Sequence, residues 1–130
     1  MILRTGIDIV DIRRIEKILK KYGDRFKNKC FLKSEINRFE KMQNNIQSYA
    51  KTFAAKEACS KALGTGLSQG IYWKDIELKN NKHGKPYLIL HNKAAKLLNA
   101  KKLTNTKIEV SISDEKNYAI SNVIIFNYEK

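Results

Sequence analysis

The sequence predicts an α+β fold, a mostly antiparallel sheet packed with helices, in one domain over residues 1–130. The length is that of a single domain, and 42% of the residues are hydrophobic, which is enough for one core. The predicted elements run strand, helices, hairpin, helix, hairpin, and strands joined by short turns pair antiparallel. No linker, internal repeat or low-complexity segment divides the chain.

The first predicted element is a strand over Ile2–Val10. Successive side chains of a strand point to opposite faces, so Ile7 and Ile9 share one face while Asp8 lies on the other, with Gly6. A carboxylate on an otherwise apolar strand is costly to bury unless it is paired or coordinated. Asp8 is therefore a candidate functional residue.

The other predicted elements follow from helix caps, apolar periodicity and turn-forming residues. In chain order they are a helix capped by Asp11 and running to about Tyr22, a short basic segment at Arg25–Phe31, a helix capped by Ser34 and running to Met42, a long helix from Ile46 to Leu63, strands at Tyr72–Leu78 and Tyr87–Leu90, a helix at Asn92–Lys101, and strands at Lys107–Ser113 and Tyr118–Phe126.

The charge balance is strongly basic, with 26 Lys and Arg against 13 Asp and Glu, a net charge of +13. Such a chain attracts nucleic acid, an anionic membrane or an acidic protein. A composition rich in Lys, Asn and Ile is also typical of AT-rich genomes, which offers a second explanation of the charge.

The cysteines and the N-terminal segment bear on the cellular compartment. Cys30 and Cys59 are too few for a disulfide framework, and neither belongs to a CxxC pair or a zinc-spaced cluster. The N-terminal segment has no long apolar run, so we expect neither a signal peptide nor a membrane span. We expect a cytoplasmic protein, or one of an organelle matrix if a transit peptide has been removed.

The segment FAAKEACSKALGTG, residues 53–66, places Glu57 and Lys61 one helical turn apart. As a surface ion pair they would stabilise the helix by about 0.2–0.5 kcal/mol. Two features favour a functional site instead. The neighbouring residues are small, which lets a ligand approach the helix, and the Gly-Thr-Gly turn brings backbone N–H groups just beyond Lys61.

A divalent cation would explain Asp8 and Glu57 together. Mg²⁺ commonly takes one or two protein carboxylates, keeps several waters and binds substrate phosphates. Lys61 would then add a positive charge for a phosphate oxygen. Residue spacing alone does not establish that Asp8 and Glu57 meet.

Four motifs resemble those of one family in their order and spacing. They are GIDIVDIRRI at 6–15, FAAKEACSKALGTG at 53–66, GKP at 84–86 and SISDEKNYA at 111–119. The chain resembles holo-[acyl-carrier-protein] synthases, the short members of the 4′-phosphopantetheinyl transferase superfamily, from about Ile2 to Val123. The first two motifs are highly specific, whereas GKP alone is weak.

The resemblance implies transfer of the 4′-phosphopantetheine arm of coenzyme A to a serine hydroxyl of an acyl carrier protein. Adenosine 3′,5′-bisphosphate is released, Mg²⁺ is required, and the process is fatty acid biosynthesis. The resemblance makes Asp8 and Glu57 metal ligands, Lys61 a phosphate contact, and Gly64 and Pro86 part of the coenzyme A cleft. Either Glu57 directly or a water on the metal oriented by Asp8 could take the serine proton.

The resemblance also implies two protein partners. Acyl carrier proteins are acidic, and arginines on the first helix of the family meet their carboxylates. By position these are Arg13 and Arg14, with Lys20, Lys21 and Arg25 as rim contacts, against the alternative of a solvated basic face. Short family members form homotrimers with each site between neighbouring subunits, so we expect a homotrimer.

One residue departs from the family pattern, which usually has His where this chain has Asp114. Asp114 could point away from the site, pair with Lys116 or lie closer to the metal, and a role carried over from the His is in doubt. We expect His83 and His91 to be ordinary turn and surface residues. Two alternatives to the enzyme stay open: a basic module for RNA or DNA, which lacks any known nucleic-acid signature here, and a degraded member that binds carrier protein without transfer.

Overall fold

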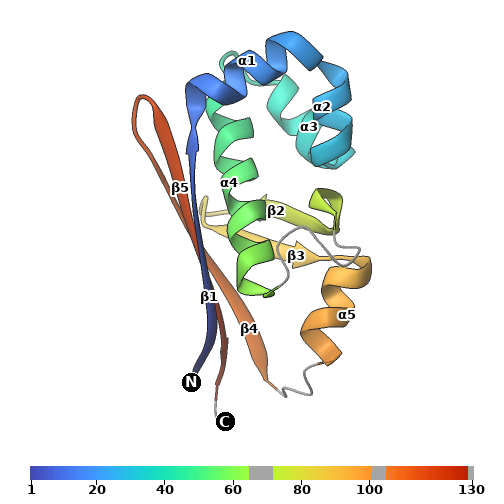
Figure 1. The fold of residues 1–130 in the computed structure, drawn as a ribbon, viewed down its shortest axis with the longest axis vertical. Helices are drawn as coiled ribbons and strands as arrows, with labels where there is room; N and C mark the ends of the chain where they lie inside the picture. The colour runs from blue at the N-terminus through green and yellow to red at the C-terminus, as the bar shows by residue number, and fades with distance from the viewer. Residues whose placement is uncertain (65–71, 101–104, 129–130) are drawn as a thin grey trace.

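The computed structural model describes residues 1–64, 72–100 and 105–128. A long three-stranded sheet forms one side of the molecule, and one helix, α4 (Ile46–Ala62), lies along its inner face (Figure 1). Three helices cover one end of α4, and a small two-stranded sheet with a further helix covers its other flank. The two chain ends lie together at the far end of the large sheet.

Both sheets are antiparallel, which confirms the predicted fold class. The large sheet has the order β1 (Ile2–Asp11), β5 (Tyr118–Asn127), β4 (Thr106–Asp114). Its register places Asp8 of β1 opposite Ser121 of β5. The small sheet pairs β2 (Ile76–Asn80) with β3 (Pro86–Leu90).

Besides α4, the helices are α1 (Ile12–Tyr22), α2 (Asp24–Cys30), α3 (Lys33–Glu40), α5 (Asn92–Ala100) and a short 3₁₀ helix η1 (Trp73–Asp75). Three of the helices, α1, α2 and α3, follow one another at the top of the fold in Figure 1, whereas α5 lies beside the small sheet. Asp11 caps α1, because its carboxylate accepts the backbone N–H of Arg13 at 2.9 Å. Within the described residues, none of these helices is long and apolar enough to cross a membrane.

Close packing of α4 against β1 sets the position of the site described below. A Cβ atom on Gly6 would collide with the carbonyl oxygen of Ala58 and lie 2.6 Å from the backbone nitrogen of Ala62. Only glycine permits this approach, so the strand lies directly against the helix. Because alternate strand residues share a face, Asp8 also points toward α4.

The core consists of two clusters on either side of the middle of α4. One joins the C-terminal half of α4 to the two sheets, and the other joins its N-terminal half to the helices at the top. The second cluster is rich in aromatic rings. The ring centre of Tyr49 lies 5.0 Å from that of Phe31 and 4.9 Å from that of Phe39, and both pairs meet edge to face.

Cys30 and Cys59 are both buried and unpaired. Burial raises the pKa of the Cys30 thiol to about 11 and that of Cys59 to about 12. Both therefore remain protonated thiols that pack as small apolar side chains.

Three predicted elements are wrong in detail. The segment predicted only as short and basic, Arg25–Phe31, forms most of helix α2, which begins after Gly23, whose φ of +51° lies in the left-handed region. Ser34 does not cap α3, because the helix already begins at Lys33. The Ser34 hydroxyl instead donates to the Glu77 carboxylate at 2.9 Å. The strand predicted from Tyr72 begins at Ile76, because the Asp75 carboxylate accepts the Tyr72 N–H at 3.0 Å and closes a 3₁₀ turn.

Candidate active site

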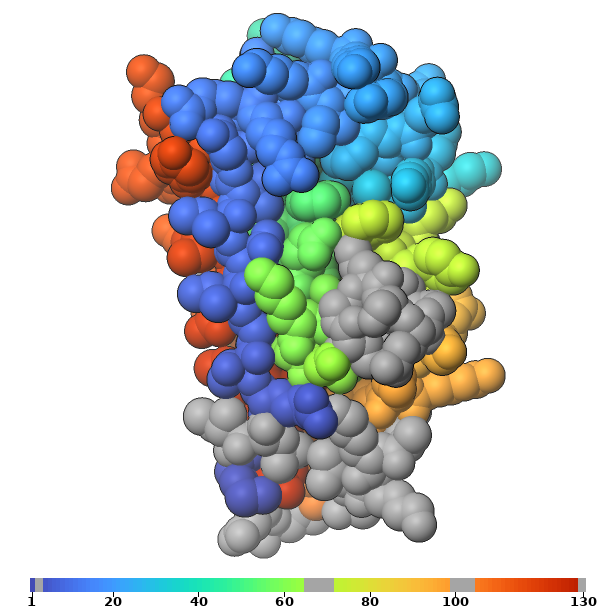
Figure 2. Space-filling view, in the orientation of Figure 1, coloured from blue at the N-terminus to red at the C-terminus, as the bar shows by residue number. Residues whose placement is uncertain are grey.

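A carboxylate and an ammonium group meet where β1 lies against α4. The Lys61 Nζ is 3.0 Å from Asp8 Oδ1 and also donates to the backbone carbonyl of Ile7 at 3.0 Å. The Asp8 side chain is only 17% exposed, whereas Lys61 is 52% exposed. Lys61 thus neutralises a largely buried carboxylate while most of its own charge remains open to solvent, on a face where α4 is uncovered beside β1 (Figure 2).

Glu57 lies one turn earlier on α4 and has a different partner. Its Oε1 accepts a hydrogen bond from the indole Nε1 of Trp73 at 3.0 Å. The alternative of a Glu57–Lys61 surface pair is therefore wrong, since Lys61 pairs with Asp8 instead. Glu57 is half-buried, and one of its oxygens is fixed by a neutral donor.

The donor set suits a hard divalent cation. In the described part of the chain, Asp8 Oδ2 and Glu57 Oε2 accept no hydrogen bond from protein, and the Lys61 ammonium already marks a cation position at Asp8. No third His, Cys, Asp or Glu of the described residues joins them in a metal cluster. Mg²⁺ commonly takes one or two protein carboxylates and keeps waters, so this pair fits Mg²⁺ and does not fit a closed zinc site.

Gly64 follows the end of α4, three residues beyond Lys61. Its φ of +88° lies in the region that favours glycine, and its N–H donates to the Lys61 carbonyl at 3.0 Å. A Cβ atom here would collide with the guanidinium of Arg4, which lies over the glycine. A second cation therefore borders the predicted phosphate position, while the rest of the Gly-Thr-Gly turn lies outside the described residues.

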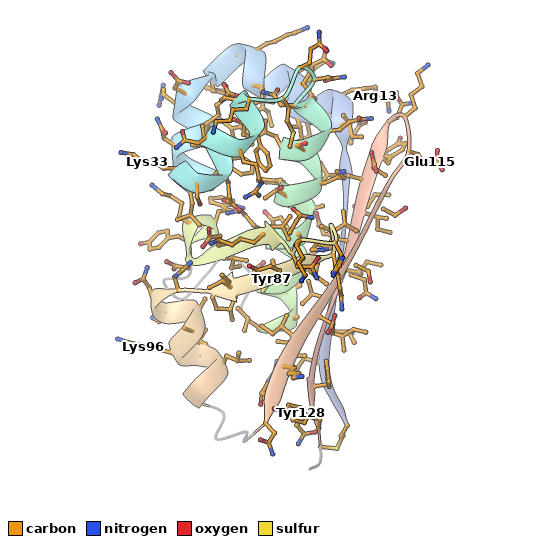
Figure 3. All side chains as sticks on the ribbon, turned by 180° about the vertical axis from the view of Figure 1, so that it is seen from behind. Arg13, Lys33, Tyr87, Lys96, Glu115 and Tyr128 are labelled. Carbon is orange, nitrogen blue, oxygen red and sulfur yellow. The ribbon has the colours of Figure 1, made fainter. Side chains whose placement is uncertain are left out.

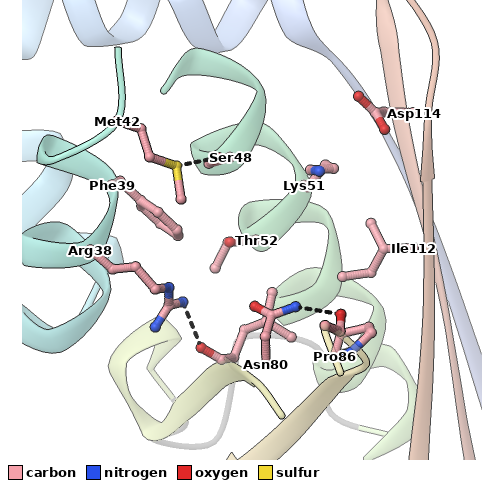
Figure 4. Close-up of a pocket in the computed structure, with 12 residues that line it drawn as sticks. Arg38, Phe39, Met42, Ser48, Lys51, Thr52, Asn80, Pro86, Ile112 and Asp114 are labelled. Carbon is pink, nitrogen blue, oxygen red and sulfur yellow. Dashed lines mark hydrogen bonds between the residues drawn. The ribbon is translucent and has the colours of Figure 1, made fainter. Parts of the chain in front are cut away.

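Pro86 is not brought to this site within one chain. It begins β3 and lines a cavity of about 540 Å³ together with Arg38, Lys51, Thr52 and Asp114 (Figure 4). An α-helix turns about 100° per residue, so nine residues from Thr52 to Lys61 reach the opposite side of α4. The Pro86 cavity and the Asp8–Glu57–Lys61 site therefore lie on opposite faces of the same helix.

The predicted docking residues on and after α1 divide into two groups. Arg13 is held by Asp11 at 2.9 Å and by the Tyr118 hydroxyl at 3.2 Å, beside the β4–β5 turn that carries Glu115 (Figure 3). Arg14 and Arg25 instead border a cavity of about 350 Å³ between α1, α2, α4 and η1.

The two lysines of the same set do not line this cavity. Lys20 pairs with Glu16 at 3.1 Å, one turn back on α1, and the Lys21 ammonium lies 5.2 Å from the centre of the Tyr22 ring. Of the five predicted residues, Arg14 and Arg25 line this cavity.

Comparisons with known proteins agree on one family. The family model of the 4′-phosphopantetheinyl transferase superfamily matches residues 4–122. This chain belongs to that superfamily. Its relatives include a holo-[acyl-carrier-protein] synthase of Rhizobium leguminosarum bv. trifolii, which is 45% identical over 127 residues, covering 96% of this chain and 95% of the relative.

Solved structures of the superfamily share the fold. The holo-[acyl-carrier-protein] synthase of Neisseria meningitidis has a TM-score of 0.89 and 30% identity, covering 98% of this chain and 100% of its own. The Helicobacter pylori synthase, solved in complex with coenzyme A, has a TM-score of 0.80 and 32% identity, covering 94% and 99%. The predicted family, fold and enzyme class, a phosphopantetheinyl transferase, are confirmed.

Asp114, which stands where the family usually has His, lies at the Pro86 cavity. Among the described residues, Asp114 forms no ion pair with Lys116 or with any other cation, and it is exposed at the end of β4. Within one chain it therefore lies at the rim of that cavity rather than beside Asp8 and Glu57.

His83 is an exposed turn residue, as expected, but His91 is not merely a surface residue. Its Nε2 lies 2.9 Å from Glu77 Oε1. Burial raises the pKa of Glu77, but hydrogen bonds from His91 and Ser34 together with the charges of Lys79 and His91 outweigh this, so the net pKa is lowered.

Sequence reasoning missed the aromatic and basic partners of the transferase site. Trp73 contacts Glu57 and also lines the Arg14 cavity with Phe26, Lys29 and Phe53. One signal was available in the sequence: Trp73 carries an indole N–H, and such a donor needs a hydrogen-bond partner when it is buried. The partner itself becomes visible only once the segment folds against α4.

Proposed function

We propose that this chain transfers 4′-phosphopantetheine from coenzyme A to a serine hydroxyl of an acidic acyl carrier protein, releasing adenosine 3′,5′-bisphosphate. The observation that carries the proposal is the Asp8–Lys61 pair at the β1–α4 junction, with Glu57 one helical turn before Lys61 on α4. The coenzyme A complex of the Helicobacter pylori synthase supports the choice of donor.

Asp8 and Glu57 would hold Mg²⁺ through the carboxylate oxygens that donors of the described residues leave free. When bound, the ion supplies positive charge against the pyrophosphate oxygens of coenzyme A. The reaction is phosphoryl-group transfer, in which the protein contributes mainly positioning and charge stabilisation.

Lys61 would contact a phosphate oxygen of coenzyme A. Its ammonium is half-exposed and bonded to Asp8 at 3.0 Å, so it can turn toward an incoming anion when Asp8 is neutralised by a metal. The left-handed Gly64 turn lies beyond it, and the Arg4 guanidinium over that glycine would supply a second positive charge for the anion.

Each active site would be formed between subunits of a homotrimer. The outer face of the large sheet is apolar and exposed, with Ile7 58% and Ile9 63% exposed and Ile9 paired with Ile120 of β5. Exposed apolar patches of this kind mark protein interfaces. In such a trimer the Pro86 cavity of a neighbouring copy would complete the Asp8 site, and the separation of the two within one chain supports this proposal.

The carrier protein would dock on the cavity bordered by Arg14 and Arg25. These guanidinium groups suit carboxylates because their planar forks bind them bidentately. The apolar lining from Phe26, Phe53 and Trp73 would receive side chains of the partner. Arg13 would contribute less, since Asp11 already occupies its fork.

Intact-mass spectrometry tests the proposed reaction. The protein is incubated with apo carrier protein, coenzyme A and Mg²⁺, and the carrier protein is weighed. The proposal predicts a mass increase by one phosphopantetheine arm together with release of adenosine 3′,5′-bisphosphate. An unchanged mass with carrier protein still bound would indicate the degraded binding member, and tight RNA binding without either would indicate the basic nucleic-acid module.

A further inference from the structure

Among the described residues, Trp73 is the one that donates a hydrogen bond to the Glu57 carboxylate. Its indole Nε1 donates to Glu57 Oε1 at 3.0 Å. A carboxylate held at one oxygen loses rotational freedom and presents its other oxygen in a defined direction. Trp73 thus controls where Glu57 Oε2 points.

The indole ring is itself held from two sides. It stacks on Phe53 of α4 with the ring centres 6.1 Å apart and the planes inclined by 23°. The Lys29 ammonium of α2 lies 5.8 Å from the ring centre. Phe53 is half-buried and packs against the core, so rotation of the indole away from Glu57 would break this stacking.

The backbone of Trp73 is anchored by a buried ion pair. The Lys56 Nζ donates to the Trp73 carbonyl at 3.1 Å, to the Ile76 carbonyl at 2.7 Å and to Glu35 Oε1 at 2.7 Å. These three bonds satisfy all three protons of the ammonium. The side chains of Lys56 and Glu35 are both 0% exposed.

Glu35 extends the same network to two other elements. Its Oε1 accepts the Leu32 N–H at 2.9 Å before α3, and its Oε2 accepts the Leu78 N–H at 2.9 Å on β2. Lys56 and Glu57 are adjacent on α4, so the helix holds the anchor of Trp73 and the acceptor of its indole next to each other. The 3₁₀ turn therefore has a fixed position relative to Glu57.

We propose that Trp73 is a positioning residue for Glu57 and that the buried Lys56–Glu35 pair holds it in place for that role. This inference rests on the proposed function, in which Glu57 binds Mg²⁺. Trp73 does not touch coenzyme A or the reacting atoms in this scheme. It orders a carboxylate before the metal arrives, so the metal does not have to select one rotamer of a mobile Glu57.

The substitution Trp73→Phe tests this. It keeps a six-membered aromatic ring against Phe53 and removes the five-membered ring of the indole with its N–H donor. Outer-sphere partners of this kind typically contribute about 10–100-fold to metal affinity. We expect Mn²⁺, used as a paramagnetic probe of the free protein, to bind Trp73→Phe about 10–100-fold more weakly in an electron paramagnetic resonance titration. The matched control is Tyr72→Phe, an exposed aromatic residue next in the chain.

Activity gives a second reading that a structural defect would not produce. In Trp73→Phe the Mg²⁺ concentration for half-maximal transfer should rise by the same factor, and saturating Mg²⁺ should restore most of the rate. A rate that falls without any rescue by Mg²⁺ would overturn the positioning role.

The native protein provides a test that does not depend on the variant folding. Trp73 is the only tryptophan of the chain, so intrinsic fluorescence reports on this one indole. Mg²⁺ should change its emission in the native protein and leave it unchanged in Glu57→Gln. An emission that stays constant while Mg²⁺ binds would overturn the inference.

The outcomes separate this inference from the proposed function. If the native protein binds no Mn²⁺, or Glu57→Gln binds it equally well, the metal assignment of Glu57 fails. If the native protein binds Mn²⁺, Glu57→Gln does not, and Trp73→Phe binds as the native protein does, only the role of Trp73 fails.

Discussion

Removing the buried ammonium of Lys56 should destabilise the fold strongly. In Lys56→Met the Glu35 carboxylate loses its counter-ion at 2.7 Å and keeps only the two backbone donors from Leu32 and Leu78. Breaking a buried pair by removing one partner typically costs about 3–5 kcal/mol of unfolding free energy. With an unfolding entropy of about 2.1 cal/mol/K per residue, that loss lowers Tm by about 10–20 °C for a chain of this length.

Thermal denaturation followed by circular dichroism measures the effect, at one protein concentration throughout because assembly also affects Tm. The matched control is Lys17→Met, the same substitution at an exposed position of α1, which should change stability by less than about 0.5 kcal/mol. Adding Glu35→Gln to Lys56→Met should recover part of the loss, since it removes the unpaired buried charge. If Lys56→Met and Lys17→Met melt at the same temperature, the buried network does not hold the fold as argued.

Three further predictions follow from the surfaces and the titrating groups. Arg14→Glu should raise the carrier-protein KM at least about tenfold with little change in the coenzyme A KM, because a close repulsive charge costs over about 1.4 kcal/mol. The control Lys17→Glu, on the same helix, should raise the carrier-protein KM less. Equal effects on the KM values of both substrates would contradict the docking surface. Ile9→Lys should convert the oligomer to monomers in light scattering, since it places charge on the apolar sheet face; an unchanged mass would refute that interface. Because the folded pKa of Glu77 lies below its ordinary 4.5, its carboxylate stabilises the fold above that pH, and the stability difference between native protein and Glu77→Gln should shrink as pH falls below it; a constant difference in pH-dependent unfolding would be inconsistent with this.

Local sequence signals predicted the elements well where one signal dominates. Asp11 caps α1 as expected, and the apolar stripe and Gly23 give its length. The same reasoning failed at Ser34, a good capping residue, because Glu35 binds the Leu32 N–H and begins the helix earlier. Glu35 in turn is fixed by Lys56 from another helix, a tertiary partner that local propensity does not reveal.

For the proposed site, the sequence predicted where its residues lie on β1 and α4 but not how they pair. Alternation placed Asp8 on the inner face of β1, and helical spacing placed Glu57 beside Lys61. That Lys61 contacts Asp8 depends on how closely β1 packs on α4 through Gly6, a distance that spacing does not fix. The separation of Pro86 from the site likewise follows from the side of α4 on which β3 packs.

The central claim is that Asp8 and Glu57 at the β1–α4 junction carry Mg²⁺-dependent transfer. The most direct measurement is the rate of phosphopantetheine addition to carrier protein, followed by intact mass over a range of Mg²⁺ concentrations. The account predicts that Asp8→Asn and Glu57→Gln each lose transfer at all but high Mg²⁺ while keeping the native Tm within a few degrees, and that Glu115→Gln, an exposed turn carboxylate, transfers normally. Near-native rates at low Mg²⁺ in both site variants would contradict it.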